Sequence, residues 1–177
     1  MKQNLFFTLL LIFSVVGCTK EKSDKVAKTP AGTFDVIMHR GVTVNDIAPA
    51  NSLDAIDLVA RVGATTVEFD IKTTKDEQIV LMHDDVLTNE FFRHAADYAE
   101  LTDETISPKS MTLDEFRAKY IQRAKDPSMR RPVPTLEEAL KLCKIKNIHP
   151  FIEIKPGFTL ALIEKAYDQA VTIMGKG

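Results

Sequence analysis

The sequence predicts an α/β fold in which helices cover a parallel β-sheet. Short β-rich runs alternate with helical patterns through residues 33–177, and this alternation is typical of parallel sheets. Polar or charged residues end each β-rich run, as they do where the carboxyl ends of the strands form the functional face of a (β/α) barrel. The chain has 177 residues, 45% hydrophobic and 27% charged, which are the proportions of a globular domain. One domain is therefore expected.

The N-terminal residues are predicted to be a leader rather than part of the domain. Lys2 precedes an apolar run over 5–13, and small residues follow it, which is typical of a signal peptide. The run is shorter than the roughly 20 apolar residues that a membrane-spanning helix needs. Cys18 comes next, in a sequence that resembles the bacterial lipobox, so we expect a lipoprotein signal peptide at 1–17 and acylation of Cys18. A plain secretory signal with an incidental cysteine is the alternative.

Residues 18–32 are polar and offer almost nothing to bury, so they are predicted to be a tether between the lipid and the domain. The domain then begins near Thr33. The remaining cysteine, Cys143, lies in an apolar helical stretch and is expected to be a small core residue. These features predict a lipid-anchored location in the bacterial cell envelope, at the outer membrane or the periplasmic face.

The first part of the domain is predicted to contain three strands and one helix. Ser52 is an N-cap signal and Gly63 a stop signal for the helix. The connection between the second and third strands is shorter than the dozen residues of a parallel crossover, so it is either an extended return or a hairpin around Asp76. The strands are expected at 34–39, 66–71 and 78–83, and the helix at 52–62.

The stretch 88–133 is mixed, polar and too long for a simple loop, so it is predicted to be an insertion. It contains one helix that begins at the capping-box residue Thr112. A second capping box at Thr135 opens a helix that runs through Cys143. A strand at 149–155 and an amphipathic helix at 159–174 are expected to follow.

Three carboxylates and one lysine are expected to converge at the strand ends. Side chains two residues apart on a strand point to the same face, which pairs Glu68 with Asp70 and Glu153 with Lys155. Carboxylates at this density repel one another unless a cation lies between them. Oxygen-only ligation suits Ca²⁺ or Mg²⁺ rather than Zn²⁺. The sequence therefore predicts one divalent cation, Ca²⁺ or Mg²⁺, at Glu68, Asp70 and Glu153.

Basic residues beside this cluster suit a phosphate diester. With a divalent cation bound, Arg40 and Lys155 bring the formal charge of the site to about +1, which complements the single negative charge of a phosphodiester. His39 and His83 end two other strands, and imidazole groups suit the roles of general base and general acid. Each histidine taken alone could be structural. The strand at 149–155 could be an exposed edge with alternating charges, although its flanking prolines favour a buried strand.

An ordered set of short motifs resembles the glycerophosphodiester phosphodiesterase family over about 36–156. The motifs are His39-Arg40-Gly41, Pro49-Ala50-Asn51-Ser52, Glu68-x-Asp70, Thr74-Lys75-Asp76, His83-Asp84, Pro134-Thr135-Leu136-Glu137-Glu138 and Glu153-x-Lys155. This resemblance implies a TIM-type (β/α) barrel of the phospholipase-C-like phosphodiesterase kind. It also implies a metal held by Glu68, Asp70 and Glu153, a catalytic pair formed by His39 and His83, and phosphate binding by Arg40 and Lys155.

Three features depart from the family pattern. Ala50 stands where the family usually has Glu, which affects how the neighbouring His39 and Arg40 are oriented. Residues 88–93 replace the Arg-Thr-Thr-Gly-type run that usually follows the His-Asp motif, although the stretch 88–133 resembles the substrate-covering insertion of the family. A complete barrel takes about 250 residues, so we expect residues 33–177 to hold only about its first half.

The resemblance implies metal-dependent hydrolysis of glycerophosphodiesters to glycerol 3-phosphate and an alcohol, by a phosphoric diester hydrolase of which this part alone could be inactive. The expected partners are the small-molecule diester and, through the lipid anchor, the membrane. The balance of 23 Lys+Arg against 25 Asp+Glu argues against nucleic-acid binding. The alternatives are a non-catalytic lipoprotein that binds phosphate and metal, and another phosphodiesterase on the same barrel, such as a sphingomyelinase-D-like enzyme.

Overall fold

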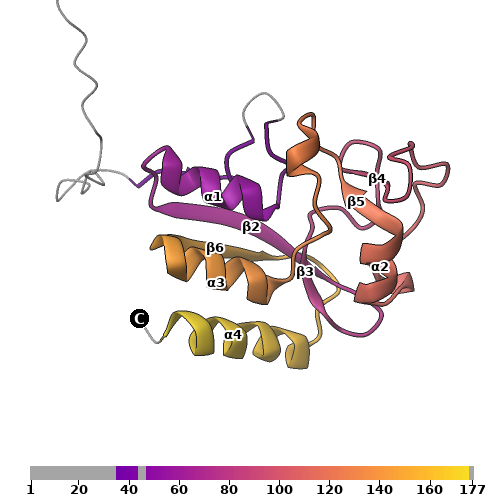
Figure 1. Ribbon diagram of the computed structural model, residues 1–177. Coiled ribbons are helices and arrows are strands. Elements are labelled where there is room, and N and C mark those ends of the chain that lie inside the picture. The colour runs from indigo at the N-terminus through magenta and orange to yellow at the C-terminus, as the bar shows by residue number, and fades with distance from the viewer. Residues whose placement is uncertain (1–34, 44–46, 176–177) are drawn as a thin grey trace, which may run out of the picture.

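The computed structural model describes residues 35–43 and 47–175 of the chain (Figure 1). The predicted signal peptide, Cys18 and the tether lie outside the described residues. None of the described helices is long and apolar enough to cross a bilayer. The strands are β1 (Ile37–Met38), β2 (Thr66–Thr73), β3 (Ile79–Leu81), β4 (Phe92–His94), β5 (Tyr120–Gln122) and β6 (His149–Ile154), and the helices are α1 (Leu53–Arg61), α2 (Leu113–Lys119), α3 (Leu136–Lys146) and α4 (Leu160–Met174).

The main sheet has four strands, and three of them, β1, β2 and β6, are parallel with β2 at the centre. β1 pairs with the start of β2, where Ile37 lies opposite Thr66, and β6 pairs with β2 in parallel over six residues. In that register Asp70 lies opposite Glu153, so β2 and β6 bring these two carboxylates to the same level of the sheet. The prediction of a parallel α/β sheet is confirmed for these strands.

The third predicted strand does not belong to the parallel set. β3 pairs antiparallel with the last residues of β2, where Ile71 lies opposite Leu81. The tight turn between them places Glu77 in the left-handed region at φ 56°, and the Thr74 N–H donates to the Gln78 carbonyl at 3.0 Å. The hairpin is thus the correct alternative, because a connection of this length closes a turn but cannot hold a crossover helix. The assumption that all four strands end at one barrel face is wrong for β3.

The helices begin at the predicted caps. Ser52 accepts a hydrogen bond from the Ala55 N–H at the start of α1, and complete capping boxes open α2 at Thr112 and α3 at Thr135. α3 continues past Cys143 to Lys146 and ends at Asn147, which adopts the left-handed conformation at φ 55°. Because side-chain caps satisfy backbone N–H groups from within the local sequence, these starting points are predictable without knowing the tertiary contacts.

The main core lies between the parallel sheet and the helices α1, α3 and α4. Alternate residues of β2 point into it, because successive strand side chains face opposite sides of a sheet. Phe69 is fully buried there between Ile56 of α1 and Leu140 of α3. Its other buried members include Val59, Val67, Ile71, Leu136, Cys143 and Ala166. The opposite face of β2 is thereby left for polar side chains.

A second core lies within the predicted insertion. Figure 1 shows β4, β5 and α2 gathered to one side of the main sheet, beyond the end of β2. Phe116 of α2 is fully buried against Phe92 of β4, with ring centroids 5.5 Å apart, and Tyr120 adds a third ring. Val80 and Met82 belong to this core, whereas their neighbours Ile79 and Leu81 belong to the main core. The hairpin strand β3 therefore joins the two cores.

The two outer strands of the main sheet differ from the sequence-based expectation. β1 is only two residues long, and among the described strands it pairs with β2 alone. β6 likewise pairs on one side only, and Phe151 is 56% exposed. The expectation of a buried strand at 149–155 is wrong for the described part of the chain, since flanking prolines limit the length of a strand but not its exposure.

Candidate active site

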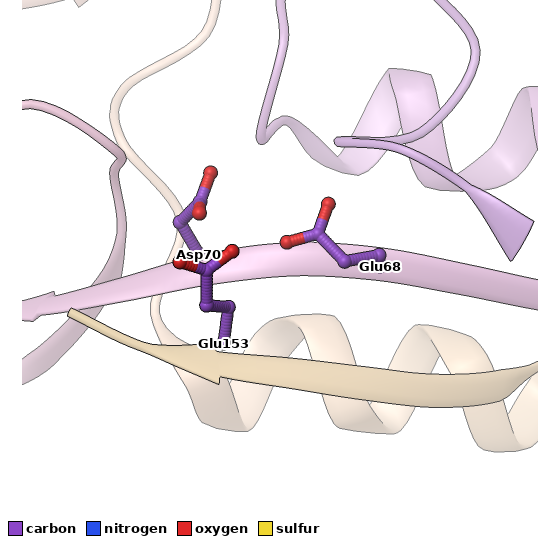
Figure 2. A group of neighbouring side chains, drawn as sticks. All are labelled: Glu68, Asp70 and Glu153. Carbon is purple, nitrogen blue, oxygen red and sulfur yellow. The ribbon is translucent and has the colours of Figure 1, made fainter.

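Three carboxylates meet on the polar face of the sheet. Glu68 and Asp70 extend from β2 and Glu153 from β6, all to the same side of the two strands (Figure 2). One oxygen from each residue lies within 4.8 Å of the others. Glu68 and Asp70 are buried and Glu153 is exposed. The predicted convergence of these side chains is confirmed, and it follows from the alternation of strand side chains and the register of β2 with β6.

Asp70 is the most heavily bonded member of this cluster. Its Oδ2 accepts a hydrogen bond from Asn51 Nδ2 at 2.9 Å and lies 3.2 Å from Arg40 Nε, while its Oδ1 lies 2.9 Å from Lys155 Nζ. Burial alone would raise the pKa of Asp70, but the bonds from Asn51 and Lys155 and the charge of Arg40 outweigh it and hold that pKa below its ordinary value. Asp70 is therefore ionised at neutral pH.

Glu68 lies in a less favourable environment. Its Oε2 accepts the backbone N–H of Arg40 at 2.9 Å, whereas its buried Oε1 has no hydrogen-bond partner among the described residues. Burial raises the pKa of Glu68 above its ordinary value, and the nearby carboxylates of Asp70 and Glu153 act in the same direction. A buried carboxylate oxygen without a partner is unstable unless a positive group binds it.

The loop after β1 brings Arg40 to the carboxylates through an unusual backbone. Arg40 adopts the left-handed conformation at φ 55°, and Gly41 follows at φ 85°. A Cβ at Gly41 would lie only 2.7 Å from the Ala55 Cβ on α1, so glycine is required there for both reasons. The loop therefore packs closely against α1, and in this conformation the Arg40 N–H donates to Glu68 Oε2.

Lys155 bridges the two strands that carry the carboxylates. Its Nζ lies 2.5 Å from Glu153 Oε1 and 2.9 Å from Asp70 Oδ1. Desolvation alone would lower the pKa of Lys155, but its bonds with Glu153 and Asp70 outweigh this and raise that pKa above its ordinary value. Both residues predicted to hold phosphate, Arg40 and Lys155, thus lie beside the carboxylate cluster, and the charged group of each contacts Asp70.

The two predicted catalytic histidines lie in different surroundings. His39 is largely exposed, and its Nε2 is 4.0 Å from Glu68 Oε2. His83 is half-buried, and its Nδ1 lies 2.5 Å from Asp84 Oδ1. Although β3 runs antiparallel, the Met82 N–H donates to the Asp70 carbonyl at 3.0 Å, so the chain has returned to the level of Asp70 when it reaches His83. His83 and Arg40 line one small hollow.

Sequence reasoning gave no role to three residues that shape the site. Asn51 exchanges two hydrogen bonds with Asp70, and Gln122 Nε2 from β5 donates to the Asn51 carbonyl at 3.2 Å. Lys72, two residues beyond Asp70 on β2, is buried and pairs with the exposed Asp85. Asn51 belongs to the motif at residues 49–52. Its residue type is a usable signal, because asparagine tolerates the left-handed backbone found there at φ 56°. Nothing in the sequence marks Gln122.

Comparison with known proteins agrees with this geometry. The sequence model of the "Glycerophosphoryl diester phosphodiesterase family" matches residues 39–176 of the chain. The chain belongs to this family. It is 32% identical over 154 residues to glycerophosphodiester phosphodiesterase 1 of Homo sapiens, an alignment that covers 84% of the chain and 42% of that protein. It is 30% identical over 127 residues to the glycerophosphodiester phosphodiesterase of Caldanaerobacter subterraneus, across 71% of the chain and 46% of that protein.

Solved structures of the family share the fold. A glycerophosphodiester phosphodiesterase from Parabacteroides distasonis superimposes with a TM-score of 0.55 at 25% identity, over 79% of the chain and 50% of that structure. A phosphodiesterase from Oleispira antarctica, solved with the product sn-glycerol-3-phosphate, superimposes with a TM-score of 0.57 at 24% identity, over 80% of the chain and 52% of that structure. The chain thus spans about half the length of its relatives, and its fold is part of the TIM-type barrel of this family.

The carboxylate cluster fits the divalent cation that the family resemblance implies. All three donors are carboxylates, and Oε1 of Glu68 is buried without a hydrogen-bond donor from the described part of the chain. Ca²⁺ and Mg²⁺ prefer oxygen ligands of this kind. Glu68, Asp70 and Glu153 are therefore the residues that would hold such an ion in a member of this phosphodiesterase family.

Proposed function

We propose that the protein to which this chain belongs hydrolyses glycerophosphodiesters to glycerol 3-phosphate and an alcohol, with a divalent cation, Ca²⁺ or Mg²⁺, at Glu68, Asp70 and Glu153. The convergence of these carboxylates beside two cations is the single observation that carries the proposal. Family membership supports the reaction class, as does the similarity to glycerophosphodiester phosphodiesterases of other organisms.

The basic residues of the site are proposed to hold the phosphate. Arg40 and Lys155 already neutralise Asp70 from two sides, so a phosphodiester arriving at this edge meets their remaining N–H donors. Guanidinium and ammonium donors bind phosphate oxygens through short charge-assisted hydrogen bonds. When bound, the cation would supply Lewis acidity that offsets the negative charge developing on the phosphate oxygens.

The two histidines are proposed to move the protons of the reaction. Cleavage takes one proton from the attacking group, which is either water or the glycerol hydroxyl of the substrate, and gives one to the oxygen of the departing alcohol. This requires a base on one side of the phosphate and an acid on the other. His39 and His83 reach the site from the loop after β1 and the loop after β3. Asp84 binds Nδ1 of His83, which orients the ring and leaves its Nε2 to exchange a proton with substrate.

A release assay on the full-length protein tests this function. The purified protein is expected to liberate glycerol 3-phosphate from glycerophosphocholine or glycerophosphoethanolamine, to lose that activity in excess chelator and to regain it with Ca²⁺ or Mg²⁺. Activity that persists unchanged in chelator would overturn the metal dependence. No release from any glycerophosphodiester, with metal supplied, would overturn the reaction class.

We further propose that the chain is a lipoprotein of the bacterial cell envelope, anchored through Cys18. The support is the sequence alone, because the signal peptide at 1–17 and the tether at 18–32 lie outside the described residues. A Cys18→Ser variant expressed with a radioactive fatty acid should take up no label while the parent chain does. Equal labelling of the two chains would exclude the anchor.

A further inference from the structure

Two hollows in the insertion side of the molecule share one arginine. The first, here called the inner hollow, has a volume of about 230 Å³ and lies beside the candidate active site. The second, here called the outer hollow, has a volume of about 420 Å³ and lies farther along the insertion. Arg123, directly after β5, lines both. Arg123 therefore borders both hollows.

The inner hollow begins at the reacting groups. His39 and Arg40 line one part of it, and Phe91 and Arg123 line the part contributed by the insertion. Ala50, whose side chain is a single methyl group, also lines it, so a larger residue at this position would fill part of the space. A group bonded to a phosphate at Arg40 would thus extend into the inner hollow and towards Arg123.

The outer hollow is rich in positive charge. Arg123, Lys125 and Arg130 line it together with Tyr98 and Ala124. No ion pair within 4.0 Å joins these three cations to a carboxylate in the described parts of the chain. The nearest acidic neighbour in sequence, Asp126, uses Oδ1 to accept hydrogen bonds from both the N–H and the hydroxyl of Ser128 at 2.8 Å. Glu90 is the one carboxylate among the lining residues of the inner hollow.

The backbone around the outer hollow is held in place by several contacts. The Tyr98 hydroxyl donates to the Ala124 carbonyl at 2.8 Å and accepts from the Ala124 N–H at 2.9 Å. The Arg130 guanidinium stacks on the Tyr98 ring, with its carbon 3.5 Å from the ring centroid. The Arg123 N–H donates to the Phe91 carbonyl at 2.7 Å, which continues the pairing of β4 with β5. The cations therefore stand on fixed elements, which reduces the entropy lost when they bind an anion.

We propose that the outer hollow binds a second phosphate, carried by the alcohol portion of the substrate. The inference rests on the proposed function, and it specifies the substrate class as glycerophosphodiesters whose alcohol is itself phosphorylated. The reacting phosphate lies at Arg40 and Lys155, the alcohol occupies the inner hollow, and its second phosphate reaches Arg123, Lys125 and Arg130. Three cations can satisfy a phosphate dianion through charge-assisted hydrogen bonds.

The phosphate of an anionic lipid in a bilayer has the same chemistry and is the other possible source. The shared position of Arg123 favours the substrate, because this residue lines the hollow that also contains His39 and Arg40. A cluster that served only to hold a bilayer would gain nothing from sharing a residue with the hollow that His39 and Arg40 line. The two sources are separated by the experiment.

The test compares glycerophosphoinositol with glycerophosphoinositol 4-phosphate, which differ by one phosphate on the alcohol. For the full-length protein, kcat/KM is expected to be at least about tenfold higher for the phosphorylated substrate, as one charge-assisted contact predicts. Arg123→Gln and Lys125→Gln should each reduce this ratio severalfold or more. Lys125 is exposed, so we expect its replacement to leave the fold intact. Lys141→Gln, which removes the same charge from an exposed pair with Glu137 on α3, should leave the ratio unchanged.

Equal kcat/KM for the two substrates, or a ratio that survives Arg123→Gln and Lys125→Gln, would overturn the inference while leaving the proposed function intact. If neither inositol substrate is cleaved, the release assay with glycerophosphocholine decides whether the proposed function stands, and calorimetry with inositol 4-phosphate against inositol then decides the binding site. Preference for the phosphate that is lost in both variants supports it, and equal binding overturns it. If both variants lose only their sedimentation with phosphatidylglycerol vesicles, the cations bind the bilayer and the inference is wrong.

Discussion

Asn51 and Asp70 bind each other through two hydrogen bonds across 19 positions of sequence. Asn51 Nδ2 donates to Asp70 Oδ2 at 2.9 Å, and the Asp70 N–H donates to Asn51 Oδ1 at 3.0 Å. Both residues are buried. This pair ties the entrance of α1 to the middle of β2 and holds one carboxylate of the candidate metal site in a single orientation.

Replacing Asn51 should therefore weaken both folding and metal binding. Asn51→Gly removes the two hydrogen bonds but keeps a residue that accepts φ 56°, and it should lower the free energy of unfolding by about 2–3 kcal/mol. Asn51→Ala should cost roughly 1 kcal/mol more, because alanine is strained in the left-handed region. Urea denaturation of the full-length protein measures both values. Wild-type stability in the glycine variant would mean that the pair contributes nothing.

The carboxylate cluster predicts the response of metal affinity to single substitutions. Glu68→Gln, Asp70→Asn and Glu153→Gln each replace an anionic oxygen ligand by a neutral one, and each should weaken Ca²⁺ or Mg²⁺ binding more than about tenfold. Glu137→Gln is the matched control, since it neutralises an exposed carboxylate that pairs with Lys141 on α3. Calorimetric titration gives the dissociation constants. Unchanged affinity in all three site variants would show that the cluster is structural.

The histidines are expected to affect turnover without affecting the metal. His39→Ala and His83→Ala should each reduce kcat by at least about 100-fold if the two groups act as base and acid. Metal affinity should stay near the wild-type value, because neither ring belongs to the carboxylate cluster. His149→Ala, an exposed residue at the start of β6, serves as the control. Wild-type kcat in either site variant would remove that histidine from the mechanism.

Substitutions at Gly41 and Gly63 distinguish the cost of backbone strain from the cost of steric overlap. Gly41 and Gly63 have similar φ values of 85° and 80°, but a Cβ at Gly63 meets no atom within 4 Å, whereas one at Gly41 lies 2.7 Å from Ala55 Cβ. Gly63→Ala should cost about 1–2 kcal/mol of folding free energy from strain alone. Gly41→Ala should cost at least about 2 kcal/mol more, because α1 must shift. Denaturant unfolding of the two variants provides the comparison, and equal losses would contradict the overlap.

Cys143 should make folding stability fall at alkaline pH. Burial raises the pKa of the Cys143 thiol from an ordinary value of 9.0 to about 12. Above pH 9 the thiol ionises in the unfolded chain but stays protonated in the folded one. Its contribution to the free energy of unfolding is therefore fully present below pH 9 and is lost as the pH rises towards 12. Cys143→Ala should show a smaller decline than the parent over this range. Parallel stability curves for the two chains would contradict the predicted burial effect.

Much of the architecture could be read from local sequence patterns. Helix caps satisfy backbone donors within their own turn, as Ser52, Thr112 and Thr135 do. The start of each of these helices is therefore predictable from a few neighbouring residues. The alternation of polar Glu68 and Asp70 with apolar Val67 and Phe69 separates the two faces of β2 in the same way. The shared face of Glu68 and Asp70 follows directly from this period of two, whereas Glu153 joins them through the register of β6 with β2.

Other features depended on contacts between distant segments. The direction of β3, the exposure of β6 and the pairing of Asn51 with Asp70 are set by which segments meet in space, and a local pattern does not encode the partner. The same holds for Arg123, which reaches the inner hollow only because the insertion folds around its own core. The sequence alone thus determined the caps, the strand periodicity and the chemistry of the site, because these arise from adjacent residues. Tertiary structure decided strand direction and the neighbours of each charge, because these arise from packing between segments far apart in the chain.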